Sequence, residues 1–228
     1  MNLKVFLPLM LVCFLASDSV AVAQLNPFQA AEEAFRARNF AKAESLYSEA
    51  IDANLRTDEA LYGRASARYW QKDFSGAKRD TLRLRTSKQY GSKTYFLLAM
   101  CEGKLGNDPA RLGYLKDGLR RFPKDPDYYN SIAWELAVST TAALRNGREA
   151  VRLARRACEL TSFRDPNCLD TLAAASAETG DFANAIKSQQ QAIALFSTRD
   201  REHLSGAQKR LVLYQSKQPY REDPRVRE

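Results

Sequence analysis

A period of 34 residues constrains the fold of this chain more than any other feature. A small residue recurs at spacings of 34, 34, 34 and 40 residues, at Ala31, Ala65, Ala99, Ala133 and Ala173. A second series follows it by 12, 12, 12, 17 and 12 residues, at Ala43, Ala77, Arg111, Ala150 and Ala185. Two series with one shared period predict five repeated units, with an insertion of five residues in the fourth.

Each unit has the pattern of two helices. The motif [DN]-F-x-x-A begins the second helix in three units, at Asn39, Asp73 and Asp181. An Asp or Asn side chain at this point can accept hydrogen bonds from the free N–H groups of a first helical turn. Apolar residues then recur three and four positions apart, which is typical of a buried helix face. Each unit is therefore expected to be a pair of antiparallel helices.

The repeated positions resemble the tetratricopeptide-repeat (TPR) family. Its pattern W-x2-L-G-x2-Y is echoed in Tyr95-x2-Leu98-Ala99, Tyr129-x2-Ile132-Ala133 and Leu169-x2-Leu172-Ala173. The resemblance covers about residues 25–198 and implies an all-α fold, a right-handed TPR solenoid of about five helix pairs. Four residues depart from the family pattern in the second and third units, where apolar or small side chains are usual: Arg64, Arg68, Arg111 and Gly118.

The chain divides into four segments on this interpretation. Residues 1–23 are a signal peptide and residues 24–198 form the solenoid. Residues 199–216 carry an apolar stripe with polar residues opposite, which predicts the capping helix that a solenoid needs at its end. Residues 217–228 contain two prolines and seven charged residues, so we expect a flexible tail.

The first 23 residues have the composition of a secretory signal peptide. Lys4 precedes an apolar run over residues 5–16, which is shorter than the roughly 20 residues that a membrane span needs. Ala21 and Ala23 form the A-x-A pattern that signal peptidases accept, and the ending resembles bacterial signals. We predict cleavage after Ala23 and an exported chain, periplasmic or secreted. The alternative is a retained membrane anchor.

Three cysteines remain after that cleavage, an odd number for an exported chain. Cys158 and Cys168 flank an expected turn between helices, so they could form a local disulfide in an oxidising compartment. The alternative is that Cys101 and Cys158 are small core residues with free thiols.

Patterns for catalysis, metals and cofactors are missing from the sequence. There is no G-x-G-x-x-G, G-K-[ST] or G-x-S-x-G motif, no C-x-x-C pair and no EF-hand loop. His203 is the only histidine, which leaves little for a zinc site or a nucleophile–histidine pair. We therefore expect a non-enzymatic protein that binds no metal and no cofactor.

The first helix of each pair lines the concave face in solenoids of the resembled family. Carried over to this chain, that geometry places eight large apolar side chains on the face: Phe28, Phe35, Tyr62, Tyr69, Trp70, Phe96, Met100 and Trp134. Aromatic anchors dominate interface energies, so the resemblance implies a scaffold that binds a protein or peptide partner in this groove. The alternative is that some of these rings pack between helices.

The formal net charge is +8 with a pI of about 9.4, which permits an anionic partner. Seven basic residues gather on second helices, which lie largely on the convex side: Lys78, Arg79, Arg83, Arg85, Arg148, Arg152 and Arg156. The second hypothesis is thus that the protein is a module that binds an anionic envelope surface or a polyanion. The alternative is that these residues form a basic face that is simply solvated. Export argues against nucleic acid, and self-association through the end units is a third hypothesis.

Overall fold

The described part of the chain, residues 25–197 and 200–222, is all-helical in the computed structural model. The predicted signal peptide, residues 1–23, lies outside these residues. Eleven α-helices and one 3-10 turn lie within them, in this order: α1 (Pro27–Arg36), α2 (Phe40–Asp52), α3 (Thr57–Trp70), α4 (Phe74–Arg83), α5 (Gly91–Lys104), α6 (Asp108–Arg121), α7 (Pro126–Val138), η1 (Ala142–Leu144), α8 (Gly147–Leu160), α9 (Pro166–Glu178), α10 (Phe182–Leu195) and α11 (Arg201–Gln215).

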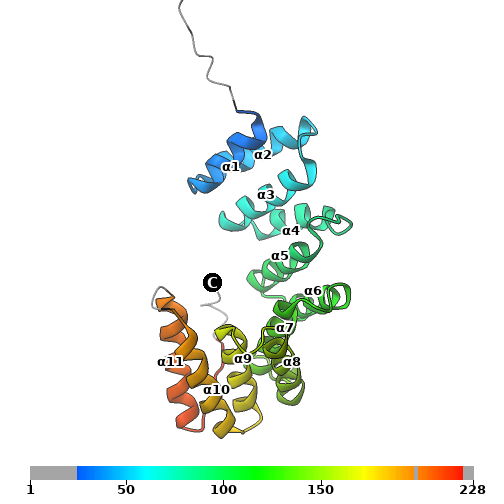
Figure 1. The fold of residues 1–228 in the computed structure, drawn as a ribbon. Coiled ribbons are helices and arrows are strands. Elements are labelled where there is room, and N and C mark those ends of the chain that lie inside the picture. Colours follow the sequence, from blue (N-terminus) through cyan, green and yellow to red (C-terminus); the bar gives the residue numbers. More distant parts are fainter. Residues whose placement is uncertain (1–24, 198–199, 223–228) are drawn as a thin grey trace, which may run out of the picture.

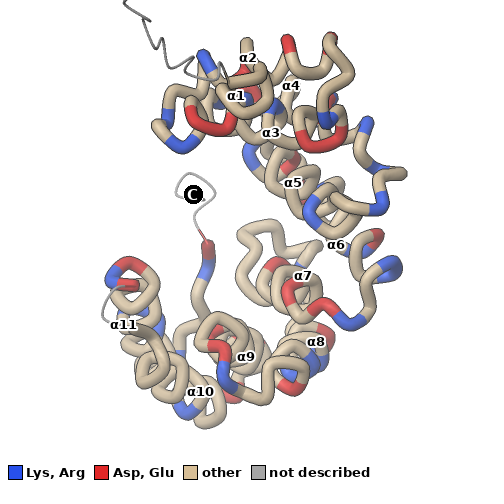
Figure 2. Tube along the Cα trace, turned by 45° about the horizontal axis from the view of Figure 1, so that its top comes forward, with Lys and Arg blue, Asp and Glu red and all other residues tan. Residues whose placement is uncertain are grey.

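The helices pack as consecutive pairs that curve into an arc (Figure 1). The first helix of each pair, α1, α3, α5, α7 and α9, lies on the inside of the arc, and the second helix lies outside (Figure 2). α11 packs on the last pair through Ala207 and Tyr214, both fully buried. The prediction of an all-helical solenoid of five helix pairs with a terminal helix is confirmed.

One type of turn joins the two helices in four of the five pairs, whereas a longer segment that contains η1 joins α7 to α8. Arg38, Lys72, Gly106 and Gly180 adopt a left-handed conformation, with φ of 58°, 67°, 75° and 81°. The next residue donates its N–H to the carbonyl five positions earlier, as Asp73 does to Arg68 at 2.9 Å. That residue then caps the second helix, because its side chain accepts from the first turn, as Asp73 does from the N–H of Gly76. This geometry explains the repeated [DN]-F-x-x-A motif.

Ion pairs replace apolar contacts where the sequence departs from the family pattern. Arg64 and Arg68 both donate to the buried Asp80 carboxylate, at 2.8 Å. Arg111 of α6 pairs with the buried Glu135 of α7, also at 2.8 Å. Gly118 has another explanation, since a Cβ there would overlap the Tyr128 ring that packs against it. The second and third units are thus held by buried charge and by one large ring.

The cysteines are free and buried in the structure. Cys101, Cys158 and Cys168 each have at most 1% of their surface exposed, and no disulfide joins Cys158 to Cys168. The suggested disulfide is therefore absent, and the alternative of small core residues is what the structure shows. Both residues belong to the apolar core shared by α8 and α9.

The expectation of a flexible tail over residues 217–228 is wrong for residues 217–222. Tyr220, Arg221 and Glu222 contact α7, α9 and α11, because their aromatic and charged groups find partners on those helices. Residues 223–228 lie outside the described part of the chain. Within that part, no helix is both long enough and apolar enough to cross a membrane.

Candidate functional site

The inside of the arc carries three neighbouring cavities, which we call together the inner groove. They have volumes of about 650, 240 and 580 Å³ and follow one another from α1 to α11. Tyr62 and Lys93 line both the first and the second cavity, and Phe96 lines both the second and the third. The groove is therefore continuous along the solenoid.

The middle cavity is the apolar part of the groove. Trp70 is 61% exposed and Met100 is 46% exposed, which is unusual for side chains of this size. Tyr69 and Leu97, both buried, also line the cavity. The Trp70 indole stacks on Phe40 at 5.9 Å between ring centroids, so its orientation is fixed before any partner arrives. This cavity can accept an apolar or aromatic side chain.

The first cavity, between α1, α3 and the residues before α5, combines aromatic rings with charges. Tyr62 and Tyr90 stack at 4.9 Å, and the Lys93 ammonium lies 6.0 Å from the Tyr62 ring centroid. The Arg56 guanidinium lies 4.5 Å from the centroid of the Phe28 ring. These cations lie over ring faces, and the Arg56 guanidinium also pairs with Glu59 at 3.1 Å, so acidic and basic side chains share this end of the groove.

A partly buried hydrogen bond joins two residues that line the first cavity. The Tyr47 hydroxyl donates to Glu32 Oε1 at 2.5 Å. Burial raises the pKa of Tyr47 far above its usual value, and the bond to the Glu32 carboxylate raises it further. Tyr47 therefore stays protonated and acts as a fixed donor that orients Glu32 toward the cavity.

The third cavity is polar and lies between α7, α9 and α11. Arg210 of α11 makes two hydrogen bonds to Asp170 of α9, at 2.9 and 2.8 Å. The same guanidinium lies over the rings of Trp134 and Tyr220, at 5.3 and 5.4 Å from their centroids. Asn130 Oδ1 also belongs to this cavity and is a buried acceptor without a hydrogen-bond partner.

Predicted contact residues divide into three groups in the structure. Trp70 and Met100 are exposed, whereas Phe35, Tyr62, Phe96 and Trp134 are partly buried and all line the groove. Phe28 and Tyr69 are only 6% and 8% exposed. Phe28 packs on Tyr47 and Tyr69 packs on Phe74, so both belong to the apolar core and present only a small part of the ring to the groove.

Several groove residues are missed by the 34-residue pattern. Tyr90 precedes α5 and Tyr220 follows α11, so neither occupies a repeated helical position. Arg210 could have been found, since Ala207 extends the series 34 residues beyond Ala173 and Arg210 lies one helical turn later. Lys93 belongs by sequence to a basic cluster, yet it lines the inner groove.

The predicted basic residues fall into two groups, those that form ion pairs and those that do not. Lys78 pairs with the buried Glu102 at 2.6 Å, while Arg152 and Arg156 pair with Glu149 and Glu159 along α8. The bond from Arg152 is the main reason that the pKa of Glu149 is lowered. Four other basic residues are exposed and make no ion pair in the described part of the chain: Arg79, Arg83, Arg85 and Arg148.

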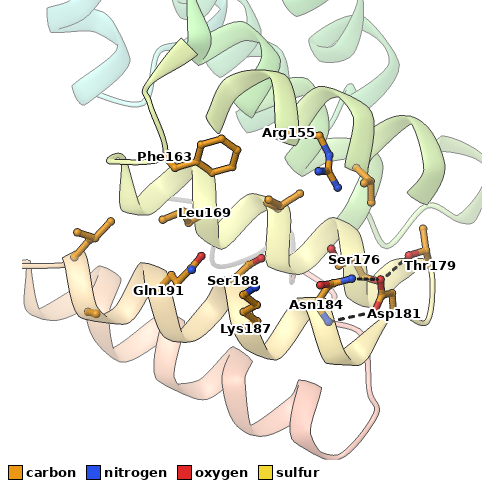
Figure 3. A pocket seen from close by; sticks show the side chains of 14 residues that line it. Arg155, Phe163, Leu169, Ser176, Thr179, Asp181, Asn184, Lys187, Ser188 and Gln191 are labelled. Atoms are coloured by element: carbon orange, nitrogen blue, oxygen red, sulfur yellow. Dashed lines mark hydrogen bonds between the residues drawn. The ribbon is translucent and has the colours of Figure 1, made fainter. Parts of the chain in front are cut away.

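A further cavity of about 620 Å³ lies on the outside, between α8 and α10 and above α9 (Figure 3). Leu169 and Leu172 are among its apolar lining residues, and Phe163, which is 47% exposed, and Arg155 lie toward opposite ends of it. Asp181 caps α10 by accepting from the Asn184 N–H at 3.1 Å. The polar end of this cavity is therefore part of a helix cap.

The only histidine of the chain, His203, lies away from any cluster of potential metal ligands in the described residues. His203 is exposed and stacks on Phe196 at 6.1 Å. No group of three or more His, Cys, Asp or Glu side chains within residues 25–197 and 200–222 could hold a metal ion. What the inner groove offers is aromatic faces, fixed cations and hydrogen-bonding groups.

Fold and groove together define a helical-repeat protein with a lined concave face. No protein-family model and no curated protein matches the sequence. Solved TPR structures do match the fold. A TPR protein of Thermus thermophilus has a TM-score of 0.57 at 18% identity, over 84% of this chain and 97% of its own.

Two more structures show the same likeness. YrrB, described as a TPR protein with an unusual peptide-binding site, has a TM-score of 0.58 at 15% identity, over 80% of this chain and 90% of its own. Part of a TPR protein from Cytophaga hutchinsonii has a TM-score of 0.60 at 16% identity, over 83% and 77%. The chain thus has the tetratricopeptide-repeat fold.

Proposed function

We propose that this protein is a non-enzymatic scaffold that binds a peptide segment of a partner protein in its inner groove. The observation that carries the proposal is the exposure of Trp70 and Met100 in the middle of a continuous concave groove. Exposed large apolar side chains gathered in a concavity mark interaction sites, and Trp is the most frequent anchor in them.

The chemistry of the groove indicates the kind of peptide. An apolar or aromatic side chain would fill the middle cavity beside Trp70. Lys93, which is exposed and makes no ion pair within the described residues, would attract a carboxylate placed beside the Tyr62 ring. Such charges increase the rate of encounter and fix the direction of the peptide more than they increase affinity.

A peptide library displayed on phage tests this proposal. Peptides selected on the wild-type chain are expected to lose about 30-fold or more in affinity for Trp70→Ala with Met100→Ala, since an anchor residue is worth about 2 kcal/mol or more. Val212→Ala is the matched control, because Val212 is also 61% exposed but lies on α11. If the selected peptides bind the double variant Trp70→Ala with Met100→Ala as tightly as they bind the Val212→Ala control, the middle cavity is not the site.

The exposed arginines of the outside favour a second candidate function. Arg79, Arg83 and Arg85 lie on and just after α4 without ion pairs in the described residues, so they are free to attract an anionic envelope surface or a polyanion. Binding to vesicles with anionic lipids should then weaken as salt rises. Vesicle binding that Arg79→Glu, Arg83→Glu and Arg85→Glu together leave unchanged would remove this candidate.

Export of the scaffold is the remaining part of the proposal, and it is supported by the sequence of residues 1–23 alone. The A-x-A pattern at Ala21 and Ala23 gives the expected cleavage site. N-terminal sequencing of the protein from an export-competent bacterial host should read from Gln24. A product that retains Met1 in a membrane fraction would mean an anchor instead.

A further inference from the structure

The segment that follows α11 turns back into the arc (Figure 2). Lys217 adopts a left-handed conformation with φ of 53°, and the N–H of Gln218 donates to the carbonyl of Leu213 at 2.9 Å. These bonds end α11 in a defined turn. Pro219 then follows, and Tyr220, Arg221 and Glu222 lie against the inner side of α7 and α9.

Each of these three residues contacts a side chain of α7 or α9. Tyr220 packs on Trp134 at 5.9 Å between ring centroids, and the Arg210 guanidinium lies over both rings. Arg221 pairs with Glu178 of α9 at 2.6 Å. Glu222 Oε1 accepts from the Trp134 indole N–H at 3.0 Å.

Main-chain groups take part as well. The N–H of Glu222 donates to the carbonyl of Val138, the last residue of α7, at 3.0 Å. The Arg221 side chain donates to the preceding carbonyl, that of Ala137, at 3.4 Å. The last carbonyls of a helix have no partner within the helix, so an extended segment lying across them satisfies groups that otherwise need water.

We infer that residues 220–222 are a built-in ligand, and that this end of the groove is a second peptide site. Its external ligand is a partner peptide with an aromatic residue, a basic residue and an acidic residue in succession. The aromatic residue replaces Tyr220 on Trp134, the basic residue pairs with Glu178, and the acidic residue accepts from Trp134. The inference rests on the proposed function, since it treats the groove as a peptide-binding surface.

The attached segment competes with any such peptide. A short attached ligand has an effective concentration of about 1 mM, so with an intrinsic Kd of about 0.1 mM it would lower the apparent affinity of an external peptide about 10-fold. Only a partner present at high local concentration, or one that also reaches the middle cavity, would displace it. The C-terminal segment would thus reserve the site for a partner that engages both parts of the groove.

Fluorescence titration of the whole purified chain tests the inference. The probe is a labelled, end-blocked peptide with the sequence of residues 218–223, Gln-Pro-Tyr-Arg-Glu-Asp. Tyr220→Ala with Glu222→Ala releases the attached segment and leaves Trp134, Arg210 and Glu178 intact. This released variant should bind the probe about 10-fold more tightly than wild type, whereas the exposed Gln218→Ala should bind like wild type.

Three results would overturn the inference. Equal affinity of wild type and the released variant, or no binding by the released variant, would mean that the segment only closes the fold. Binding that persists when Trp134→Ala is added would place the probe elsewhere. Trp70→Ala with Met100→Ala should leave probe binding unchanged, because these residues line the middle cavity. A failed probe titration would therefore contradict the second peptide site, whereas a failed library experiment would contradict peptide binding at the middle cavity.

Discussion

Asp80 is a carboxylate only 3% exposed, between two arginines of the preceding helix. Arg64 donates two hydrogen bonds to it and Arg68 donates one, all at 2.8 Å. Arg68 also reaches Glu44 of the previous unit at 2.8 Å. Removing one partner from such a network leaves the other charges desolvated and uncompensated, which costs more than the intact network contributes.

Asp80→Ala should therefore lower the free energy of unfolding by about 3–5 kcal/mol. Urea denaturation followed by circular dichroism measures this loss. Asp117→Ala is the control, since Asp117 pairs with Arg120 at the surface, and an exposed pair is worth about 1 kcal/mol or less. Similar losses for the two variants would contradict a special role for the buried network.

The three buried thiols give the chain a defined response to alkali. Burial raises the pKa of Cys101, Cys158 and Cys168 from 9.0 to about 12. Above pH 9 the unfolded chain loses thiol protons that the folded chain keeps. Stability should therefore fall between about pH 9 and 12, by about 1.4 kcal/mol per thiol for each pH unit.

Denaturation midpoints between pH 8 and 11 measure this response, and the variant with all three cysteines replaced by Ala should show a shallower slope. At pH 8 the same three thiols should resist a thiolate-selective reagent in the folded chain and react once it is unfolded. Rapid labelling of the native chain would show that these side chains are not buried.

At the scale of elements, the turn within four of the five pairs imposes one backbone conformation on different residues. Gly106 and Gly180 adopt the left-handed conformation without strain, whereas Arg38 and Lys72 carry a Cβ in the same place. Lys72 is exposed and its N–H donates to the carbonyl of Tyr69 in the same way as the equivalent glycines do. The units with Arg38 or Lys72 therefore have more backbone strain at this turn than the units with Gly106 or Gly180.

Lys72→Gly should raise the free energy of unfolding by about 0.5–1 kcal/mol, because relief of strain in the folded chain exceeds the entropy that glycine adds to the unfolded chain. Gly180→Lys should lower it by a similar amount. Thermal denaturation of both variants measures the pair of effects. A loss of stability in both would mean that the lysine side chain contributes contacts that outweigh the strain.

The same scale shows what the sequence can predict. The period is readable because the units repeat a helix cap and, except at Arg111, their small residues, so the pairs, their order and the terminal helix follow from local signals. The buried ion pairs are not readable in this way. Arg64 and Asp80 are 16 residues apart on different helices, and Arg68 and Glu44 are 24 apart, so the sequence shows only arginines at apolar positions.

The sequence predicts the lining of the inner groove only in outline. Periodicity places aromatic side chains on the first helices but does not separate neighbours such as Tyr69 and Trp70, of which one is buried and one is 61% exposed. Only packing against α4, through Phe74, decides which ring is covered. The contacts of Tyr220 and Glu222 join segments almost ninety residues apart, and no local pattern reports them.

At the scale of the whole molecule, the apolar core is not uniform along the arc. A small cluster joins α1, α2 and α3, a second joins α3, α4 and α5, and a much larger one extends from α5 to α11. Ion pairs connect them, with Arg68 to Glu44 at the first junction and Lys78 to Glu102 at the second. Because each unit contacts mainly its neighbours, local stability should follow the size of the adjoining cluster.

Hydrogen exchange followed by mass spectrometry should therefore divide the chain. Amides of α1 and α2 should exchange through openings of lower free energy than those of α7 to α10, since α1 has a neighbour on one side only and contributes to a small cluster. Equal protection of α1 and α9 would contradict this gradient and show that the ion pairs make the solenoid one cooperative unit. The gradient would leave the first cavity able to adapt its shape to a partner, while the large core keeps Trp134 and the second peptide site in place.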